Sequence, residues 1–336
     1  MATREIFCEY QPYITFNPIP PQALRSAAVS NDEVTIEHWS KKWLKNIREN
    51  KKFFGNFRDK SLGNLFGINL HKPAIIAGSG PSLKYSIEGL KDRNGIPLIS
   101  CLHNFHFFED NGVPADYYVS LDAGEVVLEE IAEGGAKTED EYWELTKDRK
   151  LIAFIGSDPR LFEKWQGEIY LYNAPVPSEA YEDAVEAIES FKCSVSNGGN
   201  VFGACLYIAK GFFGSSAIMF IGADFSFGYD RKFHSWNSKY DQKLGKCVSL
   251  VDVYGNKVPT WQSYANFKQW FDWVCTTVPG IYINCSEGGC LGSYPEGNIF
   301  QIKQMDLKVA LDMFNMHRHL KEQSIDPANA VKKILF

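Results

Sequence analysis

Short apolar runs alternate with helical stretches along most of the chain from Pro73 onward. Seven runs have the length and composition of buried strands, and in chain order they read PAIIAG, PLISCL, DYYVSL, KLIAFI, EIYLY, SAIMFIG and GIYINC. Helical patterns separate most of them, and the main ones fall at residues 83–92, 178–191, 200–212, 261–277 and about 303–321. Such apolar strands between helices are typical of a parallel sheet covered on both faces. The pattern therefore predicts an α/β fold with a Rossmann-like, mostly parallel sheet flanked by helices.

The first 64 residues follow a different pattern. Prolines and aromatic residues are mixed up to about Pro21, which predicts an extended arm. Asn31 is a candidate cap for a helix in which apolar residues recur at helical spacing from Ile36 to Phe54. We therefore expect an N-terminal extended and helical arm at residues 1–64, a main domain at residues 65–323 and a C-terminal tail at residues 324–336.

Composition narrows the class of protein. Of the 336 residues 45% are hydrophobic, which is enough for a large core. The net charge of −6 does not favour general electrostatic binding to nucleic acid or to anionic membranes. The eight cysteines are scattered without a C-x-x-C pair, so we expect reduced thiols and no zinc site. We find neither a signal-peptide pattern nor a membrane-spanning run, and we expect a cytoplasmic protein. A homo-oligomer is compatible with these features.

Glycine and polar residues follow the predicted strands, where open parallel sheets bind ligands. The first strand ends in Gly78, Ser79, Gly80, Pro81 and Ser82, directly before a helix. Glycine lets a ligand approach the backbone, and helix-opening N–H groups favour an anion. The turn is neither a complete dinucleotide fingerprint nor a P-loop. A phosphate site and a tight turn without ligand are equally compatible with it.

Two later strands end in single polar residues. Asn104 lies at a predicted helix start, where it would cap the helix by default or bind a base or ribose. Asp122 could bind ribose hydroxyls or a divalent metal, or cap the next helix.

Two glycine-rich loops extend the series. Ser196, Asn197, Gly198, Gly199 and Asn200 open an apolar helix and could offer N–H groups to a second phosphate or a carboxylate, or form a plain surface connection. The loop after the seventh strand contains Ser286 and Glu287 before two glycines. We expect these loops to converge on one crevice with the first turn.

The sixth strand leads to two candidate catalytic residues. Asp224 follows a glycine at the strand end, and His234 follows in an aromatic stretch. Because the pKa of a free histidine lies near neutrality, His234 is the candidate general acid or base. The alternative is an exposed loop histidine without a role.

These motifs resemble a known superfamily. AGSGPSLK, CLHNFHFFED, the glycine loop before GACLYIAKG and IGADFSF resemble the nucleotide-binding core of bacterial sialyltransferases. NCSEGGCLG is similar to the motility accessory factor glycosyltransferases, which modify flagellin with nonulosonic acids and share a domain with archaeal 6-hydroxymethylpterin pyrophosphokinases. The resemblance covers about residues 73–292. It implies that residues 65–323 form a nucleotide-binding catalytic domain.

The resemblance also implies roles for individual residues. Gly78–Ser82 would contact the phosphate of a CMP-type donor, Asn104 would touch the nucleotide, and Asp122 would contact ribose, phosphate or, in the pyrophosphokinase branch, magnesium. Residues 196–200 would hold the donor from the other side, and Asp224 matches the acid of a G-x-D-F motif. The sialyltransferases carry a catalytic histidine in a G-H-S segment, and the comparable stretch YGNKVPTWQSYANF has none.

Three functions follow as hypotheses. The first is a glycosyltransferase that uses a CMP-nonulosonate or UDP-sugar donor to modify a protein, glycan or nucleic acid acceptor. The second is an ATP- and magnesium-dependent diphosphotransferase in which Asp122 and Asp224 hold the metal, and the third is a non-catalytic nucleotide-binding protein. The basic and aromatic segment at residues 41–60 is a candidate acceptor surface, although a solvated helix face is the simpler interpretation.

Overall fold

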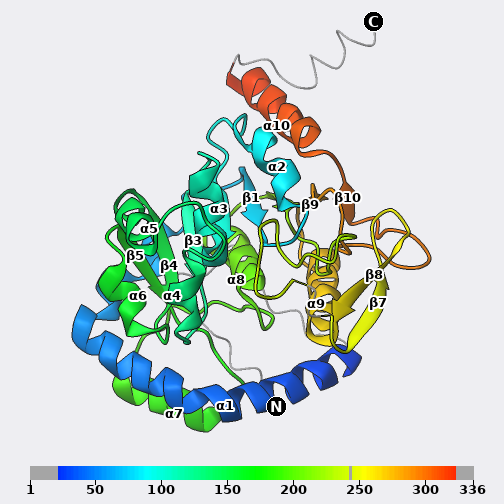
Figure 1. The fold of residues 1–336 in the computed structure, drawn as a ribbon. Helices are drawn as coiled ribbons and strands as arrows, with labels where there is room; N and C mark the ends of the chain where they lie inside the picture. Colours follow the sequence, from blue (N-terminus) through cyan, green and yellow to red (C-terminus); the bar gives the residue numbers. More distant parts are fainter. Residues whose placement is uncertain (1–21, 242–243, 323–336) are drawn as a thin grey trace, which may run out of the picture.

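The computed structural model describes residues 22–241 and 244–322 (Figure 1). Among these residues, parallel strands form one large sheet. In spatial order it contains β10 (Ile302–Gln304), β9 (Ile281–Asn284), β6 (Ala217–Ile221), β1 (Pro73–Ala77), β2 (Leu98–Cys101), β3 (Tyr117–Ser120), β4 (Lys150–Phe154) and β5 (Glu168–Tyr172). The seven predicted strands are all present, as β1 to β6 and β9, and the predicted α/β fold is confirmed.

Strand β1 lies in the middle of the sheet, and its apolar residues are covered on both faces. Residues 74–77 are fully buried, and Ile76 has Ile99 of β2 and Phe220 of β6 as its partners in the neighbouring strands. Burial of this apolar surface stabilises the fold by roughly 25 cal/mol per Å². The end of β1 is thereby fixed beside the ends of β2 and β6.

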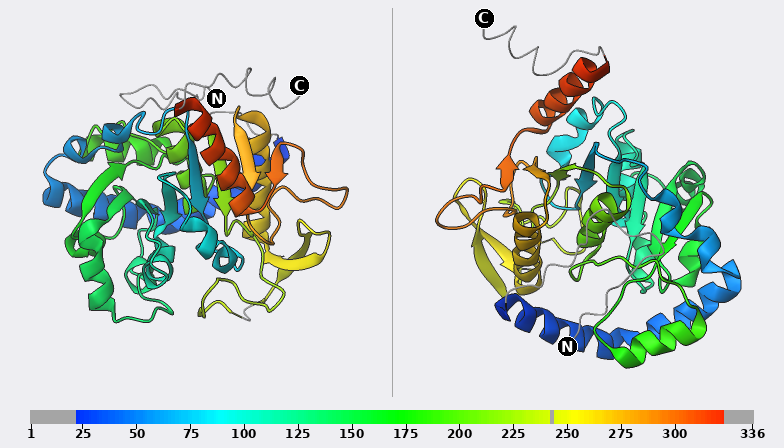
Figure 2. Two further views of the ribbon diagram at one scale, coloured as in Figure 1. Left: turned by 90° about the horizontal axis from the view of Figure 1, so that it is seen from above. Right: turned by 180° about the vertical axis from the view of Figure 1, so that it is seen from behind.

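Helices cover both sides of the sheet (Figures 1 and 2). The α-helices are α1 (Gln22–Phe54), α2 (Leu83–Leu90), α3 (Phe105–Asp110), α4 (Val126–Glu130), α5 (Glu139–Leu145), α6 (Pro159–Lys164), α7 (Glu179–Ile188), α8 (Val201–Tyr207), α9 (Gln262–Thr277) and α10 (Leu307–Glu322). Helix α8 continues as a π-helical turn, η5 (Ile208–Phe212), and short 3-10 turns are η1 (Phe57–Lys60), η2 (Leu62–Leu65), η3 (Leu102–Asn104) and η4 (Thr146–Asp148). The helices predicted at 83–92, 178–191, 200–212 and 261–277 correspond to α2, α7, α8 with η5, and α9.

The structure corrects the sequence prediction at three points. An antiparallel hairpin, β7 (Cys247–Val251) with β8 (Lys257–Trp261), was not predicted, because its strands are only partly buried and β8 contains a proline. The last predicted helix begins at Leu307, after the edge strand β10. Helix α1 begins at Gln22, so Asn31 lies inside it and does not mark its start. The predicted extended arm and the predicted C-terminal tail lie outside the described residues.

Helix α1 is fastened to the sheet by two buried asparagines one turn apart. The Asn46 side chain donates to the carbonyls of Ala123 and Gly156 at 3.2 and 3.0 Å, and Asn50 donates to those of Ile155 and Ser157 at 2.8 and 2.9 Å. These carbonyls belong to the loops that follow β3 and β4. Figures 1 and 2 show α1 running along one side of the molecule next to α7.

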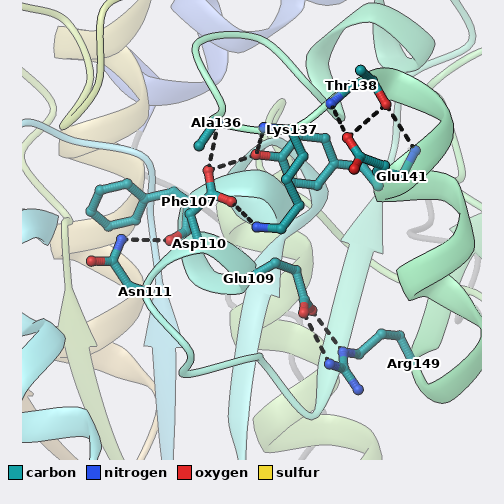
Figure 3. A network of polar contacts seen from close by, with 10 residues as sticks. Phe107, Glu109, Asp110, Asn111, Ala136, Lys137, Thr138, Glu141 and Arg149 are labelled. Carbon is teal, nitrogen blue, oxygen red and sulfur yellow. Dashed lines mark hydrogen bonds and ion pairs between the residues drawn. The ribbon is translucent and has the colours of Figure 1, made fainter.

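A polar network secures the segment that follows α4 (Figure 3). Arg149 makes a two-point contact with Glu109 at 2.7 and 2.9 Å, and Asp110 accepts from the backbone of Ala136 and from Lys137. Thr138 and Glu141 form a capping box at the start of α5. The network ties α3 to the chain on both sides of α5.

No helix in the described part of the chain is long and apolar enough to cross a membrane. The seven cysteines within the described residues are free thiols, as the sequence predicts.

Candidate functional site

A cavity of about 340 Å³ lies at the carboxyl edge of the sheet, beside the ends of β1 and β6. From β1 the chain proceeds through β2 to β5 on one side, whereas β6 begins the other side, so the loops after these two neighbours diverge. Open parallel sheets bind ligands at such a switch point. The cavity is lined by Gly78, Ser79, Gly80, Cys101, His103, Asp122, Glu130, Asn200, Val201, Phe202, Gly222, Ala223, Asp224, Phe225, Ser226, Phe233, His234, Tyr240, Trp261, Tyr264 and Phe267.

The turn after β1 is built against the turn after β6. The amides of Gly78 and Gly80 donate to the carbonyls of Ile221 and Gly222, both at 2.9 Å. A β-carbon on Gly80 would lie 2.6 Å from Cγ of Asp224 and 2.7 Å from the Gly222 carbonyl oxygen. The two turns therefore approach too closely for a side chain, which gives these glycines a structural reason that does not require a ligand.

Asp224 joins the two turns through its carboxylate. It accepts from the Ser82 amide at 2.7 Å and from the Ser82 hydroxyl. Asp224 is 4% exposed, and burial raises the pKa of its carboxyl to about 6, against the lowering effect of the two hydrogen bonds from Ser82. Because the amides of Gly78, Gly80 and Ser82 are all engaged within the protein, the turn offers an anion fewer N–H groups than its sequence indicates.

His234 is buried and held in one tautomer. Its Nδ1 lies 2.8 Å from the Ser79 carbonyl oxygen, and because a carbonyl only accepts, Nδ1 carries the proton. The ring stacks on Trp236 at 4.8 Å and meets His103 edge-on at 4.6 Å. Burial, with His103 nearby, lowers the pKa of His234 to about 3. At neutral pH the imidazole is uncharged, and its Nε2 has no hydrogen-bond partner within the described residues.

Two further carboxyl groups line the cavity, those of Asp122 and Glu130. Asp122 follows β3 and presents its exposed surface there, and the surrounding protein desolvates the group and raises its pKa. Glu130 ends α4, and burial raises the pKa of its carboxyl to about 7, a shift that Asp122 reinforces and His103 opposes. The sequence did not single out Glu130. A glutamate-rich helix gives no local sign of which carboxylate faces inward.

An aromatic wall forms part of the cavity lining. Its members after residue 230 are Phe233, Tyr240, Trp261, Tyr264 and Phe267. Phe233 packs against Trp261 at 4.6 Å and against Tyr264 at 5.1 Å. None of these five was predicted as a site residue, because they come from the unpredicted hairpin, its flanking loop and the first turns of α9.

Asn104 supports the turn after β1 and does not cap a helix. It is fully buried, and its side-chain amide donates to the Gly78 carbonyl at 3.1 Å and to the Ser100 hydroxyl at 2.9 Å. No capping bond to α3 is present, so the capping interpretation is wrong. Asp122 does not cap the next helix either, since the N-cap position of α4 is Glu125.

The loop before α8 is largely self-contained. The Asn197 side chain accepts from the Gly199 amide at 2.8 Å, and Asn200 caps α8 by accepting from the Gly203 amide at 2.9 Å. Gly198 has φ +58° and lies against the Trp270 ring, where a β-carbon would clash at 2.5 Å. Within this loop Asn200 lines the cavity, whereas residues 196–199 do not.

The loop after β9 supports the site without lining it. Ser286 is buried and accepts from the Ala223 amide at 2.9 Å, which fixes the turn that carries Asp224. Glu287 is exposed.

The structure thus brings together at the cavity seven of the predicted residues, namely Gly78, Ser79, Gly80, Asp122, Asn200, Asp224 and His234. Three further predicted residues do not line the cavity but form hydrogen bonds with the turns that do, namely Ser82, Asn104 and Ser286. The remaining predicted residues lie outside the lining and are Pro81, residues 196–199 and Glu287. Within residues 22–241 and 244–322, no three His, Cys, Asp or Glu side chains converge as a metal site.

The sequence of residues 41–230 matches the family described as 6-hydroxymethylpterin diphosphokinase MptE-like. The match spans more than half of the chain, and the protein belongs to this MptE-like family. The matched range contains the ends of strands β1 to β6, together with Asp122, Glu130 and Asp224. It stops before His234 and the aromatic wall after residue 230.

The fold resembles that of the MAf glycosyltransferase from Magnetospirillum magneticum AMB-1, with a TM-score of 0.52 and 17% sequence identity. The similarity covers 75% of this chain and 39% of that protein. An uncharacterized protein of Treponema pallidum (strain Nichols) is 26% identical over 119 residues, which is 33% of this chain. The matched part spans about half, 55%, of that relative's length.

Proposed function

We propose that the protein is a glycosyltransferase that takes a nucleotide-activated sugar, of the CMP-nonulosonate or UDP-sugar type, and transfers the sugar to an acceptor hydroxyl. The observation that carries the proposal is the composition of the cavity at the β1–β6 switch point. Its lining combines strand-end backbone with aromatic rings and carboxylates. Flat apolar faces next to hydrogen-bond acceptors suit a base or sugar ring with its hydroxyls.

The aromatic wall is a feature of this chain that the family match does not describe. Phe233, Tyr240, Trp261, Tyr264 and Phe267 all lie beyond the residues that match the family. The fold similarity, by contrast, covers three quarters of the chain and is to a protein described as a glycosyltransferase. Both observations support sugar transfer.

The donor's phosphate would lie beside Ser79 and the start of α8. The first amides of a helix have no acceptor within the helix, and they favour negative charge. Stabilising the phosphate as it leaves is the main electrostatic demand of such a reaction. His234, with its bare Nε2, would accept a hydrogen bond from a ligand hydroxyl and would stay neutral while doing so.

Ligand-dependent melting tests the proposal. Binding at a hundred times the dissociation constant stabilises a protein by about 2.7 kcal/mol, so CMP, UDP or one of their sugars should raise the melting temperature by a few degrees. Trp261→Ala should lose this increase, whereas Tyr254→Ala, at an exposed aromatic outside the cavity lining, should keep it. The proposal fails if no nucleotide sugar has an effect and ATP with magnesium does.

The family match favours a second candidate, an ATP-dependent diphosphotransferase. Asp122 and Asp224 both line the cavity, and two carboxylates together with phosphate oxygens are a typical ligand set for Mg²⁺. When bound, the ion would neutralise charge on the transferred phosphates. This activity would release AMP from ATP in a coupled assay, and an Asp122→Asn variant with full activity would count against it.

A further inference from the structure

The cavity contains a carboxyl group whose chemical use neither the sequence motifs nor the strand-end turn explains. Glu130 lies at the end of α4, half-buried, and lines the cavity together with Asp122, Tyr240 and Tyr264. These four side chains come from α4, the loop after β3, the segment before β7 and α9. They bring two carboxyls and two phenols to the lining of the cavity.

Glu130 differs from the neighbouring glutamates in its contacts. Glu125 pairs with Arg160 at 3.0 Å, Glu129 with Lys239 at 3.5 Å and Glu133 with His103 at 3.1 Å. Within the described residues, no hydrogen bond or ion pair engages the Glu130 carboxyl. A group that is desolvated, accessible from the cavity and without an internal partner is available to a ligand.

The groups that face Glu130 set its protonation. Asp122 and Glu133 raise the pKa of its carboxyl, and His103 and Lys239 lower it, while burial is the dominant effect and brings the pKa to about 7. Tyr240 and Tyr264 also interact electrostatically with Glu130. A general base works best when its pKa lies near the working pH, and the pKa of His234, at about 3, is far from it.

We propose that Glu130 is the general base that accepts the proton of the acceptor hydroxyl. The inference rests on the proposed glycosyl transfer and assigns its base to a residue other than His234. The acceptor oxygen forms a bond to the anomeric carbon of the donor sugar and gives its proton to the Glu130 carboxylate. The bond from that carbon to the phosphate oxygen breaks, and its electron pair leaves with the nucleotide. Glu130 then returns the proton to water.

Kinetics with a matched pair of variants test the inference. Because a general base contributes about 10²- to 10⁴-fold, Glu130→Gln should lower kcat at least 100-fold and leave the dissociation constant of the donor within about threefold. Glu125→Gln, on the same segment but exposed and paired with Arg160, should keep full activity. In the unaltered protein kcat should rise with pH through about 7, and this rise should be absent in Glu130→Gln.

A second measurement is independent of turnover. In protein labelled with ¹³C at glutamate carboxyls, the signal lost in Glu130→Gln should titrate near pH 7 and should shift to lower pH in Asp122→Asn. A midpoint below about 5, or normal transfer by Glu130→Gln, would overturn the assignment of Glu130 alone. An equal loss of donor binding and of kcat would also overturn it, because Glu130 would then be a binding residue. Failure of the unaltered protein to bind any nucleotide sugar would instead overturn the proposed function, and this role with it.

Discussion

The cavity has two parts that differ in how their polar groups are used. At the strand ends, the amides of Gly78, Gly80 and Ser82 all donate to the last residue of β6 or to the turn after it. Around Asp122 and Glu130, by contrast, the carboxyls face the cavity, and in the described chain no hydrogen bond or ion pair engages them. The strand-end part is therefore built to hold its shape, and the carboxyl part has unsatisfied groups to offer a ligand. The glycine-rich sequence motif lies in the strand-end part, whereas we assign the chemistry to the carboxyl part.

The largest effect is expected where the two turns meet. In Gly222→Ala the new β-carbon would lie 2.6 Å from the Gly78 carbonyl oxygen, at a residue with φ +58°. Backbone strain and the clash together should lower the free energy of unfolding by about 3 kcal/mol or more. Urea unfolding measures the change.

Gly112→Ala separates the two causes. Gly112 has φ +67°, and a β-carbon there would meet nothing within 4 Å. This control should therefore lose only about 1 kcal/mol, the cost of the backbone conformation. Equal losses in Gly112→Ala and Gly222→Ala would show that the close approach of the turns contributes little to stability.

Asp224 and Asp122 allow the same substitution in the two parts of the cavity. Asp224→Ala leaves the amide and hydroxyl of Ser82 without their acceptor and should cost about 1–3 kcal/mol at pH 7. Asp122→Ala removes a carboxyl that is exposed at the cavity and makes no hydrogen bond within the described chain, so its effect should stay within about 0.5 kcal/mol. Thermal unfolding of both variants checks the difference. A larger loss for Asp122→Ala would contradict the division into two parts.

The smallest effect is a change in pH dependence. The pKa of Glu130 is about 7 in the folded protein and ordinarily 4.5, so between these values the folded state binds more protons than the unfolded state. The contribution of Glu130 to stability is full below about pH 4.5 and is lost as the pH rises through 7.

Glu130→Gln, which cannot ionise, should therefore gain stability relative to the unaltered protein when measured at pH 8 instead of pH 5. The two pKa values correspond to about 2–3 kcal/mol, and solvent at the half-buried carboxyl should reduce the gain to about 1 kcal/mol. Chemical unfolding at the two pH values gives the comparison. A gain of the same size in Glu125→Gln would mean that the effect comes from the overall charge of the segment.

The core of the fold could be predicted because its signal is local. A run such as AIMFI in β6 is buried at every position, so its composition alone marks a strand. The hairpin of β7 and β8 gave no such signal, because β7 is only partly buried and Pro259 lies within β8. Its stability depends on packing against α9, which the local sequence does not encode.

The site was predictable only in part, for a related reason. The positions of the predicted strands along the chain and the rule that ligands bind at carboxyl ends were enough to select Gly78, Asp122 and Asp224. Glu130 lies on a helix and Trp261 on a hairpin, and the orientation of both elements depends on contacts between distant segments. The same limit applies to Asn104, whose amide turns to the Gly78 carbonyl, 26 positions away, and does not cap the adjacent helix.

The clamp formed by Asn46 and Asn50 makes α1 a structural support of the cavity. Each asparagine supplies one amide group to two backbone carbonyls, and one of these carbonyls belongs to Ala123, next to Asp122. If the chain were cut before residue 65, those four buried oxygens would lose their donors and the loop bearing Asp122 would lose its anchor. The smallest unit that can keep the cavity in shape therefore includes the N-terminal helix, although the sequence pattern sets that helix apart from the sheet.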